Sequence, residues 1–378
     1  MGTTTNYAIP YPEPTDFVTD GATAMESIAE QVDAQMFATV ANRNLLYNAA
    51  IQVAQRGTST ASITTTNYYT ADRWQHGVET MGTWTSTIEN DAPTGSGFRK
   101  SLKMLCTTAD ASPAAGDNVA IQQLLEGQDL QAIRKGTSSA QSISVSFWVK
   151  SNRTGTYIAE LYDFDNTRQC SKSYVINATA TWEYKTVTFP ADTIGALDND
   201  ASQSLMLKLW LGAGSTFSSG TLNQTWASVT AANRAVGQVN VASAINNYWQ
   251  ITGVQMTIGA VAPPFQFKAF QQDLAECQRY YIQDSLKARF TFWMGGDAYM
   301  DSNMYTFPVS MRSSPVMVIR DNAGTAGQVY AVYGGGSFGN ITATATGYTD
   351  GFIIQRGSMV TNSGGKAACS YTASAELT

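Results

Sequence analysis

The chain has 378 residues, of which 43% are hydrophobic and only 14% are charged, and its formal net charge is −6. A chain of this length predicts two or three domains, and its apolar content is sufficient for packed cores. Because Lys and Arg form no run, we expect no nucleic-acid partner. Lys and Glu are depleted at protein interfaces, so the low charge favours a surface covered by copies of the chain or by partners.

The beginning of the chain lacks the common targeting segments. Met1–Pro10 has neither the basic nor the apolar region of a secretory signal peptide, and no apolar run reaches about 18 residues. We therefore expect no signal peptide and no membrane insertion. The cysteines, Cys106, Cys170, Cys277 and Cys369, are widely spaced. This spacing predicts buried thiols in a protein made in a reducing cytoplasm, rather than disulfides or a zinc site.

Residues 1–44 are expected to form an extended leader and a helix for attachment and oligomerisation. Prolines surround Tyr11 and fix an extended backbone that is suited to lying across another protein. An apolar stripe at helical spacing consists of Met25, Ile28, Ala29, Val32 and Met36. A helix with so short a stripe is not stable alone in water, so we expect the stripe to pack either on the body of its own chain or on two further copies about a three-fold axis.

Residues 45–267 predict an antiparallel jelly-roll β-sandwich, because hydrophobic and polar residues alternate between turns rich in Gly, Asn, Asp and Ser. Residues 268–290 are expected to be a helical linker, and 291–378 a second, small C-terminal β-domain of short strands. The predicted fold class is therefore mainly β, with a short N-terminal helical leader. The clearest aliphatic rows are Ile143, Val145, Phe147 and Val149 in one strand, and Leu205, Leu207, Leu209 and Leu211 in another.

Two tryptophans lie opposite these aliphatic rows, each beside a lysine: Trp148 with Lys150, and Trp210 with Lys208. An exposed indole is a platform for the apolar face of a sugar ring, and polar neighbours bind the hydroxyl groups. The same indoles suit a subunit contact, or burial under a further layer, equally well. These four residues are the carbohydrate-binding candidates.

Two pairs of aspartates are the candidate metal ligands: Asp163 with Asp165, and Asp198 with Asp200. They suit either a structural Ca²⁺ ion, which binds clustered carboxylates and carbonyls, or ordinary turns. Two carboxylates at a suitable separation also serve glycoside hydrolysis. No other cofactor is expected. The single histidine, His76, excludes a zinc site of several histidines and is expected to be structural.

Several segments resemble structural appendage proteins of bacteriophage particles. NLLYNAAIQVAQRG at 44–57 is similar to the opening of such proteins, and SISVSFWVKSNRTGTY at 142–157 and YWQITGVQMTIGAVAPPFQFKAF at 248–270 occur in the same order. ECQRYY at 276–281 and YTASAEL at 371–377 are similar to their junction and closing strand. The layout of the body also resembles the galactose-binding-type jelly roll of carbohydrate-binding modules, a likeness of fold that does not fix the ligand.

The resemblance implies a non-enzymatic virion structural protein, namely a homotrimeric fibre, spike or decoration appendage on a phage head or tail. Such a protein is made in the cytoplasm of the bacterial host and reaches the virion surface. It contacts other virion proteins through its leader, and binds host-surface polysaccharide with avidity from three sites. Two alternatives stay open: a polysaccharide depolymerase that uses paired carboxylates, and a capsid cement protein that binds only capsid subunits. No β-helix repeat, which would favour the depolymerase, is visible.

Overall fold

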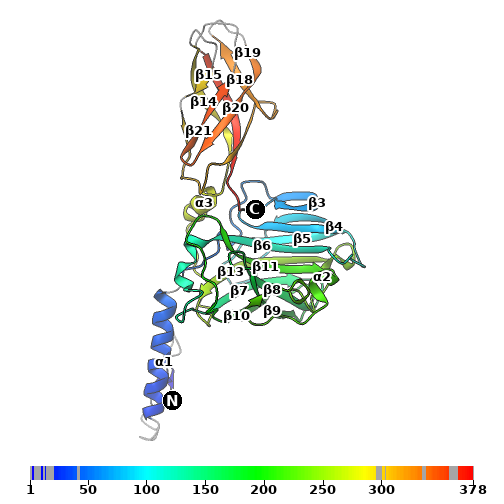
Figure 1. Cartoon of the computed structure of the whole chain (residues 1–378), viewed down its shortest axis with the longest axis vertical. Coiled ribbons are helices and arrows are strands. Elements are labelled where there is room, and N and C mark those ends of the chain that lie inside the picture. The colour runs from blue at the N-terminus through cyan, green and yellow to red at the C-terminus, as the bar shows by residue number, and fades with distance from the viewer. Residues whose placement is uncertain are drawn as a thin grey trace.

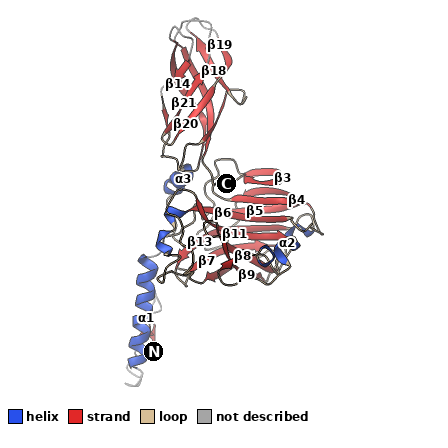
Figure 2. Ribbon diagram, in the orientation of Figure 1, coloured by secondary structure: helices blue, strands red, loops and turns tan. Residues whose placement is uncertain are grey.

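The computed structural model describes residues 2–3, 10–11, 13, 21–40, 43–294, 300–302, 304–333, 338–356 and 365–377. Helix α1 (Gly21–Val40) and a narrow C-terminal β-domain lie at opposite ends of the molecule, with a β-sandwich between them (Figure 1). Strands dominate both β units (Figure 2). The structure confirms the predicted fold class: a mainly β chain with a helical leader, an antiparallel jelly-roll sandwich and a second, smaller β-domain.

The sandwich sheet contains eleven strands. They are β3 (Ser59–Tyr68), β4 (Gln75–Glu89), β5 (Ser101–Thr108), β6 (Asn118–Glu126), β7 (Ile143–Ser151), β8 (Gly155–Asp163), β9 (Arg168–Ile176), β10 (Glu183–Phe189), β11 (Gln203–Ala213), β12 (Ala227–Ser228) and β13 (Tyr248–Ile258). Short helices join some of them: η2 (Gly127–Asp129), η3 (Gln131–Ile133), α2 (Ser215–Ser218), η4 (Ala231–Asn233) and η5 (Val241–Ser243).

Strands that follow one another in the chain mostly alternate between two layers. One layer has the order β5-β13-β7-β10, and the other has the order β6-β11-β8-β9. This alternation is the connection pattern of a jelly roll. The sheet is continuous because β4 pairs with β6 through its first half and with β5 through its second half. β3 pairs with β4 and forms an additional strand beside both layers.

A sharp bend in β4 allows that strand to serve both layers. Thr80 has a φ of 52° and Gly82 a φ of 71°, so the backbone enters the left-handed region twice within three residues. A Cβ atom at Gly82 would lie 2.6 Å from the carbonyl oxygen of Thr108. Only glycine fits there without displacing the backbone of the neighbouring strand.

The two predicted aliphatic rows face each other in the core of the sandwich. Phe147 of β7 and Leu207 of β11 have no exposed surface and belong to the same buried cluster. Full burial of such a side chain stabilises the fold by roughly 1.5–3 kcal/mol. Because side chains alternate along a strand, Trp148 lies on the outer side of one layer and Lys208 on the outer side of the other.

In its described residues, the C-terminal β-domain contains a sheet of nine strands. β14 pairs with β22 from Tyr281 onward, so strand structure begins inside the segment 268–290 that was expected to be a helical linker. Only α3 (Phe270–Gln278) is helical in that segment. The strands are β14 (Tyr281–Met294), β15 (Met300–Ser302), β16 (Tyr305–Thr306), β17 (Val316–Arg320), β18 (Gln328–Tyr333), β19 (Phe338–Thr342), β20 (Thr344–Tyr348), β21 (Gly351–Arg356) and β22 (Gly365–Ser374).

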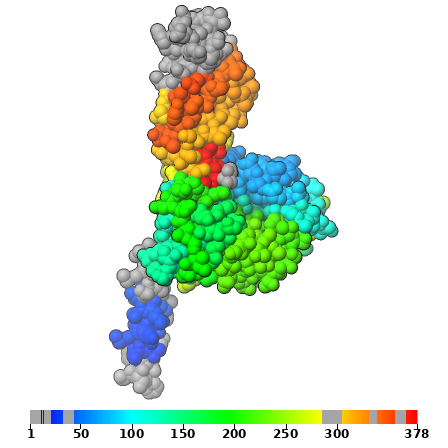
Figure 3. Space-filling model, in the orientation of Figure 1, coloured from blue at the N-terminus to red at the C-terminus, as the bar shows by residue number. Residues whose placement is uncertain are grey.

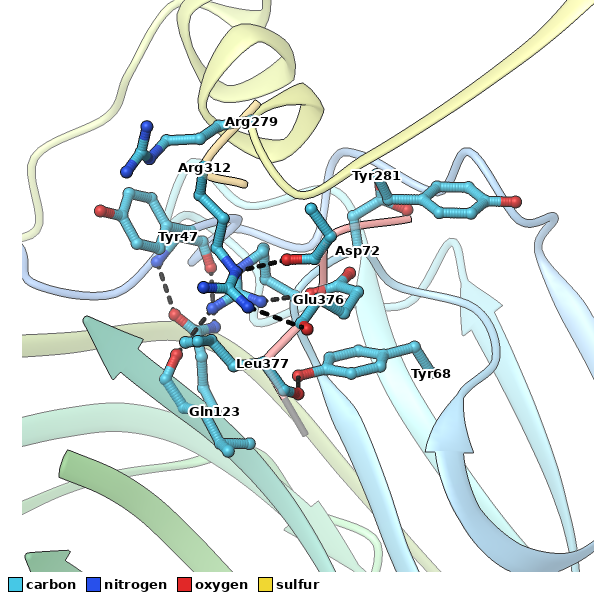
Figure 4. Close-up of polar contacts among 12 residues, drawn as sticks. Tyr47, Tyr68, Asp72, Gln123, Arg279, Tyr281, Arg312, Glu376 and Leu377 are labelled. Atoms are coloured by element: carbon cyan, nitrogen blue, oxygen red, sulfur yellow. Dashed lines mark hydrogen bonds and ion pairs between the residues drawn. The ribbon is translucent and has the colours of Figure 1, made fainter. Parts of the chain in front are cut away.

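After β22 the chain returns to the sandwich, and its last described residues lie between the two β units (Figure 3). The hydroxyl of Tyr68 donates a hydrogen bond to the carbonyl of Leu377 at 2.9 Å (Figure 4). Glu376 forms ion pairs with Arg73 and, at 3.0 Å, with Arg56. Arg73 has no exposed surface. The C-terminal residues therefore fasten the second β-domain to the sandwich.

Two aromatic rings from the residues that follow α3 complete this contact. The guanidinium carbon of Arg73 lies 3.5 Å from the ring centroid of Tyr280, and that of Arg56 lies 3.5 Å from the ring centroid of Tyr281. Burial alone would lower the pKa of Arg73, but the carboxylate of Glu376 raises it above its usual value. We call Arg56, Arg73, Tyr280, Tyr281 and Glu376 the junction clamp.

The lone histidine and the cysteines are all buried. His76 lies in β4 with no exposed surface, and its Nε2 is 2.7 Å from the Ser86 hydroxyl. All four cysteines are free and buried, which confirms the prediction of buried thiols. Among the helices of the described ranges, none has both the length and the apolar composition required to cross a membrane.

Candidate functional site

A groove crosses the outer face of the layer that contains β6, β11 and β8. Its volume is ≈ 580 Å³. Its lining comes from β3, β4, β6, β8 and β11, the turn after β8, and the segment between β12 and β13. We call it the sheet groove, and its lining residues are Thr66, Asn67, Tyr68, Gln75, Gln122, Leu124, Tyr162, Phe164, Gln203, Met206, Lys208 and Arg234.

Strand register builds the floor of the sheet groove. Gln75 of β4 is opposite Gln122 of β6, which is opposite Lys208 of β11. Directly opposed residues point to the same side of a sheet, so these three form a polar row across the layer. The adjacent row is apolar and consists of Leu124, Met206 and Tyr162.

Two half-buried aromatic rings line the groove beside this floor. The ring centroids of Tyr162 and Phe164 are 4.8 Å apart, and their planes are inclined by 58°. The guanidinium carbon of Arg234 lies 4.8 Å from the ring centroid of Tyr162. Aromatic faces of this kind bind the apolar face of a flat or cyclic ligand.

The amide side chains of the groove retain unused hydrogen-bonding capacity. Gln122 donates from Nε2 to Oε1 of Gln75 at 2.5 Å. Oε1 of Gln122 and Oε1 of Gln203 are buried, and within the described part of the chain neither accepts a hydrogen bond. A buried acceptor without a donor costs about 1–3 kcal/mol. Hydroxyl groups of a bound ligand would remove that cost.

Two cations lie in the groove with different partners. Arg234 donates to both carboxylate oxygens of Glu160, at 2.7 and 3.1 Å. Nζ of Lys208 donates to Oδ1 of Asn118 at 3.3 Å and lies 4.0 Å from the ring centroid of Trp210. Burial, assisted by the positive charge of Arg234, lowers the pKa of Lys208 to about 7.

Trp210 is buried, which is one of the alternatives that the sequence left open. Its indole has no exposed surface and donates to Oε2 of Glu160 at 2.9 Å. The segment between β11 and β13 folds over this part of the outer face, so that Phe217 and Ala235 pack in one cluster with Trp210. Of the alternatives left open for Trp210, the structure therefore favours burial under a further layer over a sugar platform, whereas Lys208, predicted beside it, does line the groove.

Trp148 and Lys150 lie on the outer face of the other layer and do not meet Lys208 or Trp210. Trp148 is half-buried, and its ring centroid is 5.4 Å from that of Tyr184. Lys150 forms an ion pair with Asp91 and lies 5.0 Å from the ring centroid of Trp182. The four carbohydrate-binding candidates are thus divided between opposite faces of the sandwich.

The aspartates of the two pairs make the contacts of an ion pair and of turns. Asp163 is fully buried and pairs with Nζ of Lys135 at 2.5 Å, so its contacts favour a structural role over a metal ligand or a catalytic carboxylate. Asp165 accepts from the backbone amide of Asp198 at 2.9 Å, and Asp200 accepts from the amide of Ser202 at 2.8 Å. These contacts are typical of turns. In the described ranges, no three His, Cys, Asp or Glu side chains gather closely enough to hold a metal ion.

The attachment candidates lie on the leader and α1, away from the sheet groove. Met25 is 71% exposed, and Val32 and Tyr11 are also exposed, while Ile28 is half-buried. Helix α1 projects from the sandwich (Figure 1), and Met25 and Val32 of its apolar stripe are left exposed by the described residues. The side chain of Met36 lies outside the described residues.

A second hollow, of ≈ 340 Å³, is lined by the aromatic rings of Phe98, Phe267 and Phe270, among others. None of its lining residues has a buried polar atom without a hydrogen-bond partner, whereas the sheet groove contains two such residues. The sheet groove is therefore the better candidate for a polar ligand.

Sequence analysis did not identify most of the groove residues. Gln122 and Tyr162 lie within strands whose other face is buried. The alternation of hydrophobic and polar residues along these strands indicates only that the two side chains face outward. Arg234 comes from an irregular segment, and no local pattern indicates that it reaches the sheet. The arrangement offers aromatic faces, unpaired acceptors and cations, which are groups that bind a ligand. Glu160, the carboxylate beneath the groove, is fully buried and held by Arg234 and Trp210.

Comparison with known proteins gives similar folds at low identity. A sugar-binding protein described as putative, from Bacteroides thetaiotaomicron, matches 57% of this chain and 100% of its own, at 12% identity and a TM-score of 0.33. The xylan-binding domain of Xyn10C from Paenibacillus barcinonensis matches 58% of this chain and 97% of its own, at 11% identity and a TM-score of 0.27.

The enzymatically active domain of tailspike protein 4 from bacteriophage CBA120 matches 57% of this chain at 13% identity and a TM-score of 0.31. The matched part is 21% of that tailspike chain. No protein-family model matches this sequence, and no curated protein matches it.

Proposed function

We propose that the chain is a non-enzymatic appendage protein of a bacteriophage particle that binds polysaccharide in the sheet groove. The observation that carries the binding function is the composition of the groove, where aromatic faces lie beside buried amide oxygens that lack donors. A polysaccharide supplies both complements, because its rings have apolar faces and its hydroxyl groups donate hydrogen bonds.

The shape of the groove fits a chain ligand. Its lining extends over five neighbouring strands, from Thr66 of β3 to Tyr162 of β8. Neighbouring strands are about 4.8 Å apart, so the lining spans on the order of 20 Å, the length of several sugar units. Tyr162 and Phe164 provide a stacking surface, and Gln122 and Gln203 provide acceptors along the same surface.

The appendage role rests on the phage-like motifs and on α1. Met25 and Val32 are exposed and Ile28 is half-buried, so this stripe is apolar surface that association would bury. Three copies joined through this helix would form a homotrimer on the virion surface, with the leader contacting other virion proteins and three grooves supplying avidity. Mass spectrometry of purified particles from a producing host tests this role, and absence of the chain from such particles would contradict it.

Substitutions in the groove test the binding function. Full-length protein is assayed on an array of bacterial surface polysaccharides, and affinities for the bound members are then measured by calorimetry. Tyr162→Ala and Gln122→Ala should each weaken binding about tenfold, because each removes one contact worth on the order of 1 kcal/mol. Tyr184→Ala is the matched control, since it removes an exposed aromatic ring from the opposite face.

The possible results separate the candidate functions. If Tyr162→Ala and Gln122→Ala bind as the unsubstituted protein does and keep its melting temperature, the groove is not the binding site. If the full-length protein binds no polysaccharide, the binding proposal fails and the cement-protein alternative is favoured. Release of reducing ends from a bound polysaccharide would contradict the non-enzymatic part of the proposal.

A further inference from the structure

We propose that the sheet groove selects acidic polysaccharide, with a carboxylate of the glycan pairing with the ammonium group of Lys208. The inference rests on the proposed function, because it names the class of polysaccharide that the same groove takes. It is carried by a buried lysine on the groove floor that forms no ion pair within the described part of the chain.

The contacts of Lys208 leave its ammonium group incompletely satisfied. An ammonium group has three N–H donors. Within the described residues, the hydrogen bond of Lys208 Nζ is the one to Oδ1 of Asn118, at 3.3 Å, and no carboxylate forms an ion pair with it. The side chain is only 8% exposed, so little water reaches it. Burial of a charge without a partner is unfavourable, and a carboxylate of a ligand would correct this.

A second buried lysine, Lys135, shows how a buried ammonium group is paired within this chain. Lys135 is also buried, and its Nζ pairs with Asp163 at 2.5 Å and with Asp192 at 3.0 Å. It also donates to two backbone carbonyls, at 2.8 and 3.0 Å. Lys135 thus has two carboxylates from its own chain, and Lys208 has none within ion-pair distance. From this difference we infer that the ammonium group of Lys208 binds a ligand, whereas that of Lys135 stabilises the fold.

The charges around Lys208 leave its own charge as the unbalanced one. The lining of the sheet groove includes two cations and no carboxylate. Glu160 of β8 neutralises Arg234 through two hydrogen bonds. Glu79 of β4 acts on Lys208 only from a distance, is exposed, and accepts from the hydroxyl of Thr66 at 3.0 Å. The facing residues of β6, Asn118 and Gln122, carry no charge.

The surroundings of Lys208 also predict a pH dependence. Burial, followed by the charge of Arg234, lowers its pKa to about 7, while Glu160 and Glu79 act in the opposite direction. In the free protein the ammonium form therefore prevails at about pH 6 and is largely lost by about pH 8. The affinity for an acidic glycan should fall over this range, whereas that for a neutral glycan should not.

The experiment uses matched glycans that differ only in charge. The probes are alginate, polygalacturonate and hyaluronan, each alongside the same polymer after chemical reduction of its carboxyl groups to alcohols. Binding to full-length protein is measured at pH 6 and pH 8. We expect at least one acidic polymer to bind. The affinity of its reduced form should be lower by a factor of about ten or more, because reduction removes a hydrogen bond to a charged group.

Two lysine variants locate the effect. Lys208→Met keeps the aliphatic stem over Trp210 and should reduce binding of the acidic polymer about tenfold, removing the difference between pH 6 and pH 8. Lys103→Met is the matched control, because Lys103 lies in β5 on the opposite outer face with its Nζ 5.0 Å from the ring centroid of Tyr248. It should bind as the unsubstituted protein does. The comparison of native and reduced polymers requires no variant, so it holds even if Lys208→Met does not fold.

Four results would overturn the proposal. Equal affinity for native and reduced polymers means that the groove does not select charge, although polysaccharide binding itself then stands. Unchanged binding by a folded Lys208→Met variant means that another cation is responsible. If none of the six polymers binds while other neutral glycans do, the proposal of acid selection fails, but the proposal of polysaccharide binding stands. If no glycan of any kind binds, the proposed function fails with it.

Discussion

Replacement of Glu376 by Gln tests whether the junction clamp holds the C-terminal β-domain on the sandwich. The carboxylate pairs with Arg73, which has no exposed surface, and with Arg56, whose side chain is 11% exposed. Glutamine keeps nearly the same size but removes the negative charge. Arg73 then retains only neutral partners, namely the ring of Tyr280 and the carbonyl of Leu124, to which it donates at 2.6 Å.

The magnitude follows from the burial of the pair. Removing one partner of a buried ion pair costs about 3–5 kcal/mol, because the remaining charge stays buried without compensation. Arg56 keeps a carboxylate, Asp72, at 3.6 Å, so the cost arises mainly at Arg73. We therefore expect Glu376→Gln to lower the free energy of unfolding by about 3–5 kcal/mol.

Glu276→Gln provides a matched control beside the same junction. Glu276 of α3 pairs with Lys268 at 2.6 Å, and both side chains are partly exposed, at 25% and 21%. Such a pair contributes about 0–1 kcal/mol. Urea unfolding of both variants at pH 7, followed by circular dichroism, measures the two costs. A loss for Glu376→Gln that equals the loss for Glu276→Gln would refute the assignment of the clamp as a stabilising contact between the β units.

Two further predictions concern assembly and acid stability. Removal of residues 1–42 should reduce the mass measured by light scattering from that of a trimer to that of a monomer, because it removes the exposed stripe of α1; an unchanged trimer would place assembly in the β units. Burial lowers the pKa of His76 to about 3, below its unfolded value, so His76 contributes stability that is present above about pH 6.5 and is lost as pH falls towards 3. Between pH 6.5 and 5 the free energy of unfolding should therefore fall by about 2 kcal/mol more in the unsubstituted protein than in His76→Asn. If the free energies of unfolding of the two proteins run parallel over this pH range, the lowered pKa of His76 is contradicted.

The fold was largely predictable because it depends on a local signal. Alternation over a single strand indicates a buried row, and Phe147 and Leu207 occupy the core as expected. The bend in β4 was not predictable in this way. Gly82 is one of 31 glycines, and only the approach of the Thr108 carbonyl from another strand explains why it is needed there.

The candidate site was less predictable because it depends on register between strands that are distant in sequence. Lys208 was correctly placed on an outer face, but its neighbours Gln75 and Gln122 come from other strands. Alternation could not decide between exposure and burial of Trp210 for a related reason. Alternation indicates which side of a strand a residue is on, but not whether a distant segment, here the one carrying Phe217 and Ala235, covers that side.

The junction clamp and the sheet groove share residues, which leads to a last prediction. Tyr68 lines the groove, and its hydroxyl donates to the carbonyl of Leu377, next to Glu376. Leu124 lines the groove as well, and its carbonyl accepts from Arg73. The C-terminal residues therefore support one wall and part of the floor of the groove, although Glu376 itself does not line it.

Glu376→Gln should consequently weaken polysaccharide binding, although Glu376 contacts no ligand in the proposed groove. Loss of its pairing with Arg73 frees the chain on both sides of the contact, including the Leu377 carbonyl that holds Tyr68. A displacement of about 1 Å at a binding group is sufficient to lose much of its contribution. Calorimetry of Glu376→Gln and Glu276→Gln with the same glycan, at a temperature where both are folded, measures the effect. Equal affinities would mean that the groove keeps its shape without the clamp, and that the two features act independently.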